Sequence, residues 1–161
     1  MSDGKKILEG GCACDTVRYR MESAPLIVHC CHCHYCQRAS GASFALNALI
    51  EADRVTLLEG EPDDVMTPTR SGKGQNVVRC PNCRVAVWSN YAGMGDKVRF
   101  VRVGSLDQGH GLAPDIHIFT NYKQPWVVIP DGHASVGEYY DMKEVWRTES
   151  LARFKTLRDS G

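Results

Sequence analysis

Short apolar segments recur along the chain, with clusters of glycine and proline between them. Many of these segments are rich in β-branched or aromatic residues, which favour strands. Glycine and proline at positions such as 60–62, 71–74, 93–95 and 109–114 mark turns and loops. The pattern therefore predicts a mainly β, largely antiparallel domain. The predicted strands are 17–21, 26–30, 44–50, 55–58, 77–78, 85–88, 98–103, 116–119 and 126–129.

The C-terminal part has a different pattern. Val145, Trp146, Leu151, Phe154 and Leu157 are closely spaced with charged residues between them, which predicts a short terminal helix that packs across the sheet. A chain of 161 residues fits one domain, and a domain near this size buries roughly 68–70% of its unfolded surface. We expect a main domain over residues 8–132 and an extension over 133–161 that packs on it.

Charge and hydropathy narrow the range of partners. Lysine plus arginine and aspartate plus glutamate are balanced at 19 each, so no net field draws the protein to nucleic acid or to an anionic membrane. The apolar start is too short for a signal peptide, and no segment approaches ~20 continuous apolar residues. We therefore expect a cytoplasmic protein with small-molecule or protein partners. In a reducing compartment its eight cysteines indicate metal ligands or catalytic thiols more than disulfides.

Four of the cysteines form two spaced pairs. Cys12 and Cys14 are two residues apart, and Cys80 and Cys83 have the C-x-x-C spacing of zinc knuckles. Sulfurs around one zinc lie ~3.8 Å apart, which a modest bend allows for both pairs. Four thiolates fill a tetrahedral site, so this set predicts a structural zinc. The alternative is that Cys12 and Cys14 are merely small buried residues.

Three further cysteines lie within six residues. Cys31, Cys33 and Cys36 can reach one metal through a single tight turn and leave the fourth position of zinc open for water or a substrate atom. Cys30 points away from Cys31 on an extended segment, so we interpret it as a buried structural cysteine.

Two alternatives concern this second set. A nearby imidazole can close the tetrahedron and make the site structural, with His34 ahead of His29 and His32. Cys33 and Cys36 can also be interpreted as a redox dithiol, although the flanking sequence lacks a strand-to-helix thioredoxin unit.

Together these motifs resemble one known family. The matching stretches are 10–14, 31–38 with Gly41, 71–74, 80–83, 117–120 and 124–126, and the ordered set of seven cysteines is their most specific part. In these stretches, from about Gly10 to Pro130, the chain resembles the glutathione-dependent formaldehyde-activating enzyme family, which also includes centromere protein V. The resemblance implies a fold of several coiled β-sheets.

The resemblance also implies metal sites and an activity. Cys12, Cys14, Cys80 and Cys83 would hold a structural zinc, and Cys31, Cys33 and Cys36 a catalytic one, giving two Zn²⁺ per chain. The implied activity is that of a carbon–sulfur lyase that forms or cleaves S-(hydroxymethyl)glutathione from formaldehyde and glutathione. The expected partners are glutathione or a related small thiol and a small aldehyde. The rival hypothesis is a zinc-scaffolded binding module without turnover.

The chain departs from the family at two turns. Asp15 and Arg84 stand where the family usually has glycine after its cysteine pairs. Asp15 adopts left-handed backbone geometry fairly readily, whereas Arg84 does so at a cost. We therefore expect the second turn to differ from the family's.

Three other residues are candidates for the chemistry. Lys73 and Arg38 each sit in a motif near a cysteine group, and a tripeptide with two carboxylates needs cations, although both residues also fit as ordinary solvated charges. His117 is a candidate proton donor or support for a zinc ligand, and equally a satisfied structural histidine. Trp126 is more typical of a core residue than of a stacking platform.

Overall fold

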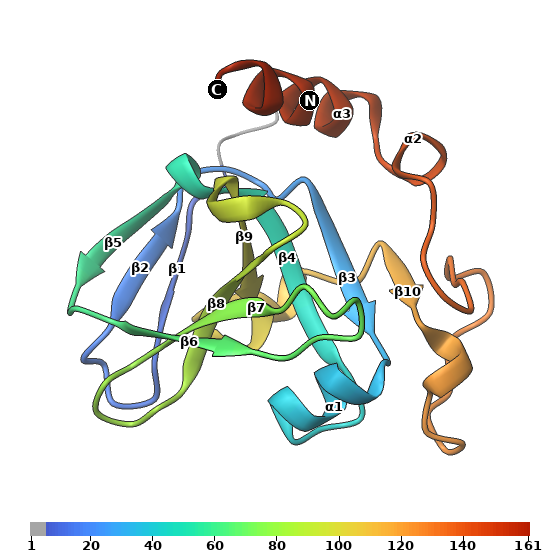
Figure 1. The fold of residues 1–161 in the computed structure, drawn as a ribbon, viewed down its shortest axis with the longest axis horizontal. Helices are drawn as coiled ribbons and strands as arrows, with labels where there is room; N and C mark the ends of the chain where they lie inside the picture. The colour runs from blue at the N-terminus through green and yellow to red at the C-terminus, as the bar shows by residue number, and fades with distance from the viewer. Residues whose placement is uncertain (1–5) are drawn as a thin grey trace.

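A seven-stranded sheet forms the centre of the protein, and a three-stranded sheet packs beside it (Figure 1). The structure is a computed structural model that describes residues 6–161. The smaller sheet has the order β1 (Leu8–Gly11), β2 (Arg18–Met21) and β5 (Val55–Glu59). The larger one has the order β10 (Ile116–Ile118), β3 (Ile27–Cys31), β4 (Ala45–Glu51), β9 (Val98–Arg102), β8 (Ala86–Tyr91), β7 (Gln75–Arg79) and β6 (Asp63–Thr67).

Nearly all strand pairs are antiparallel. The exception is the short edge strand β10, which pairs with β3 in parallel. The helices are α1 (His34–Ser40), α2 (Met142–Val145) and α3 (Thr148–Asp159), with short 3₁₀ turns at Ala52–Arg54, Gly95–Lys97, Val103–Ser105, Gly109–Gly111 and Thr120–Tyr122. Within residues 6–161, no helix is long and apolar enough to cross a membrane. The predicted mainly β fold with a short C-terminal helix is confirmed.

One predicted strand is wrong. Residues 126–129 form an irregular loop between Pro125 and Pro130, and the Val127 amide donates to the Gln124 carbonyl within this loop at 3.1 Å. Trp126 is 71% exposed and Val128 is 82% exposed, so Trp126 is not a core residue. Two strands were not predicted, because β1 has the sequence Leu-Glu-Gly-Gly and β6 is an exposed edge strand that begins with two aspartates.

The two faces of the larger sheet bury separate cores. On one face, residues such as Val28 and Ala48 pack with Tyr19 and Met21 of the smaller sheet. On the other face, Leu49 and its neighbours pack against the C-terminal segment. The alternation of side chains along a strand produces this division, and it also decides which cysteines and histidines share a face.

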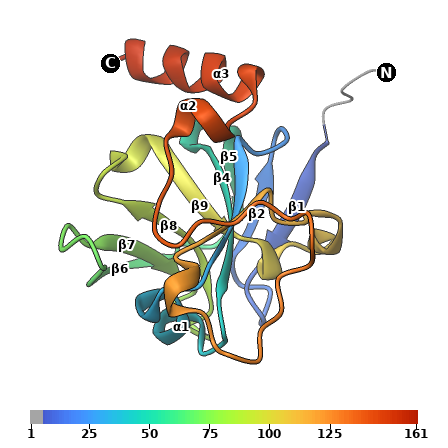
Figure 2. The same cartoon turned by 90° about the vertical axis from the view of Figure 1, so that its right-hand side faces the viewer.

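The C-terminal segment is fixed to the sheet by polar and apolar contacts. Figure 2 shows α3 lying across one end of the strands. The Ser150 hydroxyl donates to the Leu26 carbonyl at 2.6 Å, and the Arg153 guanidinium binds the buried Glu51 carboxylate at 2.8 and 2.5 Å. Apolar residues of this segment complete the second core: Trp146, Leu151, Phe154 and Leu157.

Candidate metal centres and the adjoining cavity

The first cysteine cluster joins the two sheets. Cys12 directly follows β1 and Cys80 directly follows β7. A tight turn after each of them brings in the second cysteine of its pair, Cys14 or Cys83. The Cys14 sulfur lies 3.6 Å from that of Cys12 and 3.7 Å from that of Cys80, and all four sulfurs lie within 4.8 Å of one another. These separations match the ~3.8 Å expected around tetrahedral zinc.

Several sulfurs of this cluster accept hydrogen bonds, as the sulfurs of thiolates do. The Val17 amide donates to Cys12 Sγ at 3.3 Å, and the Asn82 amide donates to Cys80 Sγ at 3.4 Å. The pKa of Cys14 is lowered to about 5, first by the hydroxyl of Thr16 and then by the side-chain amide of Asn82. All four sulfurs lie within 4.8 Å of one another, and this donor set fits Zn²⁺.

Both turns after the cysteine pairs have left-handed backbone geometry. Asp15 has φ 61° and Arg84 has φ 65°, so Arg84 adopts the left-handed geometry despite the cost that its side chain predicts. Left-handed geometry costs a non-glycine residue roughly 1–2 kcal/mol. The C-x-x-C turn still holds it, because the Arg84 amide donates to the Cys80 carbonyl at 3.1 Å and the Cys80 amide to the Val85 carbonyl at 3.0 Å.

The second cysteine cluster spans the end of β3 and the start of α1. Cys31 is the last residue of the strand, and Cys33 is the N-cap of the helix, with its sulfur accepting the Cys36 amide proton at 3.4 Å. The sulfurs of Cys31, Cys33 and Cys36 lie within 4.8 Å of one another. Among residues 6–109 and 111–161, no histidine or carboxylate joins this cluster as a fourth ligand.

The three thiols compete for negative charge. Hydrogen bonds from Cys31 and Cys36 lower the pKa of Cys33, and the bond to Cys33 raises the pKa of Cys31. Without a cation, one thiolate therefore forms at the expense of its neighbours. A divalent ion lets all three ionise, and three sulfurs on one tight turn fit Zn²⁺ with an open position.

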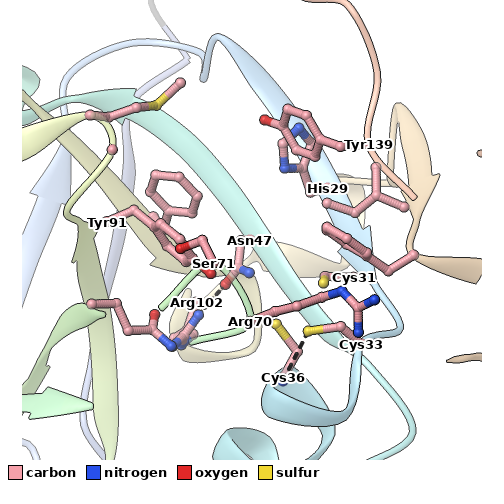
Figure 3. Close-up of a pocket in the computed structure, with 16 residues that line it drawn as sticks. His29, Cys31, Cys33, Cys36, Asn47, Arg70, Ser71, Tyr91, Arg102 and Tyr139 are labelled. Carbon is pink, nitrogen blue, oxygen red and sulfur yellow. Dashed lines mark hydrogen bonds between the residues drawn. The ribbon is translucent and has the colours of Figure 1, made fainter. Parts of the chain in front are cut away.

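A cavity of about 490 Å³ opens beside this cluster (Figure 3). The three cysteines form part of its wall, and its surface is mostly apolar. Its aromatic lining consists of Tyr91, Phe100, Phe119 and Tyr139. Its other polar lining residues are His29, Asn47, Arg70, Ser71, Gln75 and Arg102. The volume lies in the range of small-molecule sites.

Two arginines bring positive charge to the cavity. Arg102 lies directly across from Asn47 in the β4–β9 pair and donates to its side-chain oxygen. Burial lowers the pKa of Arg102, and no carboxylate of residues 6–161 lies within 4.0 Å of its guanidinium nitrogens. The Arg70 guanidinium lies 4.0 Å from the ring centroid of Tyr122 and 3.7 Å from the carboxylate of Glu138.

A buried histidine lines the same cavity. His29 shares the Cys31 face of β3, and burial lowers its pKa to about 4, so its ring is neutral at pH 7. Its Nε2 atom is hydrogen-bonded to the Tyr140 hydroxyl, which accepts the Trp146 indole proton at 2.8 Å. Because the indole only donates, the Tyr140 proton is free to point at His29.

Gln37 fastens the loop that follows β10 beside the second cluster. Its side-chain amide donates to the carbonyls of His32 at 2.7 Å and Tyr122 at 3.0 Å, and its oxygen accepts from Gln124 at 2.8 Å. This loop carries Phe119, which lines the cavity. The hydrogen bonds therefore fix one wall of the cavity relative to the cysteines.

Three residues selected from the sequence lie outside the cavity lining. Lys73 is exposed in the loop between β6 and β7, and Arg38 is exposed on α1. His117 lies on the opposite face of β10 from Ile118, which lines the cavity, and its ring contacts His32. His34 is exposed, whereas Cys30 is buried, as its interpretation as a structural cysteine requires.

Asn47, Arg70 and Arg102 line the cavity but were not selected from the sequence. Asn47 and Arg102 are polar residues within predicted apolar strands. A polar residue at such a position can indicate a binding or catalytic site, because a polar side chain is seldom buried without a role. Their pairing depends on the β4–β9 register, which a single sequence does not contain. Arg70 lies in a loop, where an arginine carries no such signal.

Comparisons with known proteins agree with the motifs. The family described as "Glutathione-dependent formaldehyde-activating enzyme" matches residues 7–122, which include all eight cysteines of the chain. A crystal structure of a Rhodobacter sphaeroides protein from a structural genomics programme is similar, with a TM-score of 0.48 and 17% identity over 62% of this chain and 88% of that chain. A search among curated proteins found no match. Because the family match covers well over half of its length, the chain belongs to the glutathione-dependent formaldehyde-activating enzyme family.

Proposed function

We propose that the protein is a zinc-dependent carbon–sulfur lyase that forms and cleaves the adduct of glutathione and formaldehyde at the second cysteine cluster. The observation that carries the proposal is the position of Cys31, Cys33 and Cys36 in the wall of a cavity of about 490 Å³. A closed structural site needs no such opening. Family membership supports a formaldehyde-activating activity of this kind.

The reaction is an addition without net oxidation. The thiol sulfur forms a bond to the aldehyde carbon, the carbon–oxygen double bond becomes single, and the thiol proton ends on the new hydroxyl. Zinc held by Cys31, Cys33 and Cys36 would lower the pKa of a thiol at its open position and so supply the nucleophile. The reverse reaction breaks the same bond and returns the proton to sulfur.

Arg102 and Arg70 would hold the carboxylates of the thiol substrate. Arg102 is half-buried and has no carboxylate partner among residues 6–161, so an anionic ligand in the cavity would compensate its charge. Arg70 keeps its guanidinium on the Tyr122 ring and meets Glu138 only at 3.7 Å, so it remains available to a second carboxylate. These two lining residues serve the proposed role better than the exposed Lys73 and Arg38.

His29 would donate a hydrogen bond from Nδ1 to the aldehyde oxygen as that oxygen gains negative charge. Its ring is neutral and lines the cavity, and the Tyr140 proton directed at Nε2 leaves the ring's own proton on Nδ1. Trp146 fixes Tyr140 and thereby the orientation of His29. His117, on the opposite face of the sheet, supports the structure in this proposal.

We expect Arg102→Gln to weaken glutathione binding roughly ten- to hundredfold, since a hydrogen bond to a charged group contributes about 1.5–3 kcal/mol. The affinity for 2-mercaptoethanol, which lacks a carboxylate, should be unchanged. Calorimetric titration of both thiols measures this, with Arg38→Gln as the matched surface control. Equal weakening of both thiols would mean that Arg102 stabilises the cysteine cluster instead of the substrate.

Glutathione titration of a cobalt-substituted sample tests the open position. Cobalt absorption reports the ligand set, so we expect a saturable spectral change when the thiol binds. An unchanged spectrum would exclude the open site. A spectral change without turnover of formaldehyde and glutathione would favour the rival function, a zinc-scaffolded thiol-binding module.

A further inference from the structure

A third group of metal-ligating side chains lies on the face of β3 opposite to the cavity. Side chains alternate along a strand, so His29 and Cys31 face the cavity while Cys30 and His32 face away from it. In the parallel pair of β3 and β10, His117 is the direct partner of Cys30. Alternation and register therefore bring Cys30, His32 and His117 together on paired strands.

These three side chains converge in the protein interior. Cys30 is 2% exposed, His32 is 0% exposed and His117 is 8% exposed. The His32 Nε2 atom lies 3.6 Å from Cys30 Sγ and 3.0 Å from His117 Nδ1, and the three atoms lie within 4.8 Å of one another. No carboxylate of residues 6–161 belongs to this group.

Hydrogen bonding alone does not satisfy the group. A neutral imidazole nitrogen is either one donor or one acceptor, so His32 Nε2 can pair with Cys30 or with His117 but not with both. The outer atoms His32 Nδ1 and His117 Nε2 have no partner. These outer atoms lack a hydrogen-bond partner both with and without an ion at the inner atoms, so they do not distinguish the metal-bound from the metal-free form. A cation between the inner atoms would use all three lone pairs.

The separations suit such an ion. With metal–nitrogen bonds of ~2.05 Å and metal–sulfur bonds of ~2.3 Å, the 3.0 Å and 3.6 Å separations correspond to angles of about 95° and 110°. The second angle is close to tetrahedral, and the first is about 15° narrower, so a slight separation of the two imidazoles would accommodate the ion. One thiolate with two imidazoles is a donor set for Zn²⁺ and related thiophilic ions.

We propose that Cys30, His32 and His117 form a third metal site, for a divalent thiophilic ion of the zinc type, that fastens the edge strand β10 to β3. β10 is three residues long and continues into the loop that carries Phe119 of the cavity wall. A metal bridge across this pair would add to the backbone hydrogen bonds that β10 makes with β3 on one side and with Ala134 and Val136 on the other.

The third site should bind more weakly than the other two. One thiolate leaves the bound ion with a net positive charge in a buried place, which is unfavourable. The site should therefore fill last as metal is added.

Cadmium NMR of the full chain tests the proposal, because the ¹¹³Cd resonance moves downfield as the number of sulfur ligands rises. We expect three resonances at saturation, for four, three and one sulfur ligands, with the upfield one appearing last. Zinc analysis should likewise rise from two to three equivalents per chain as free zinc increases.

The Cys30→Ala variant should lose only the upfield resonance and the third zinc equivalent. The two remaining resonances report that the variant is folded, and His34→Ala serves as the control for an exposed histidine of the same motif. Two resonances in the unmodified protein at saturating cadmium would overturn the proposal. So would an upfield resonance that persists in Cys30→Ala.

Discussion

The Cys33→Ser variant is expected to lose turnover and one zinc ion per chain while it keeps its fold. Serine is a favoured N-cap residue, so α1 should still begin at the same position. Two thiolates remain, which is too few for a tightly held zinc. Removing the metal's stabilisation of developing charge removes several kcal/mol, or roughly a thousandfold in rate.

The measurement must separate catalysis from the uncatalysed addition. Exchange spectroscopy of formaldehyde, glutathione and their adduct gives the rate above background, and elemental analysis with circular dichroism gives metal content and fold. His34→Ala is the matched control, because this exposed residue of the same motif belongs to none of the three clusters. A folded Cys33→Ser protein with unchanged turnover would refute the catalytic role of this cluster.

The cysteine sites are the part of the molecule that the sequence predicts best. Zinc needs sulfurs ~3.8 Å apart, and the C-x-C and C-x-x-C spacings achieve that separation through local turns alone. The N-cap geometry of Cys33 and the turn at Cys80 are local in the same sense. Arg84 shows the limit of such local prediction, since the C-x-x-C turn outweighs the residue's own backbone preference.

Sequence patterns did not predict the cavity, because its lining depends on long-range contacts instead of on local turns. Its lining comes from strands and loops whose register and order are set by long-range pairing, as for Asn47 with Arg102. The strand prediction for residues 126–129 was wrong because it relied on local propensity alone. The local β propensity of this segment is high, but Pro125 and Pro130 bound it and no neighbouring strand pairs with it in the part of the chain that the structure describes.

Replacing Cys83 with serine is expected to unfold the protein, in contrast to Cys33→Ser. The first cluster joins the turn after β1 to the turn after β7, so its metal connects segments that are remote in sequence and belong to different sheets. A structural zinc contributes about 10–16 kcal/mol. That is comparable to the whole net stability of a domain, about 5–15 kcal/mol. Loss of one ligand should therefore remove the cooperative thermal transition.

Circular dichroism melting and zinc content of the purified chain measure this outcome, and a strong chelator added to the unmodified protein should reproduce it. Arg84→Gly is the matched control, because it changes the same turn, keeps all four sulfurs and fits the left-handed geometry that the turn requires. A Cys83→Ser protein that melts like the unmodified one would contradict the structural role of the first cluster. If Cys33→Ser and Cys83→Ser lost their fold equally, the division into one structural and one catalytic zinc would be wrong, since only the metal that joins the two sheets should control folding.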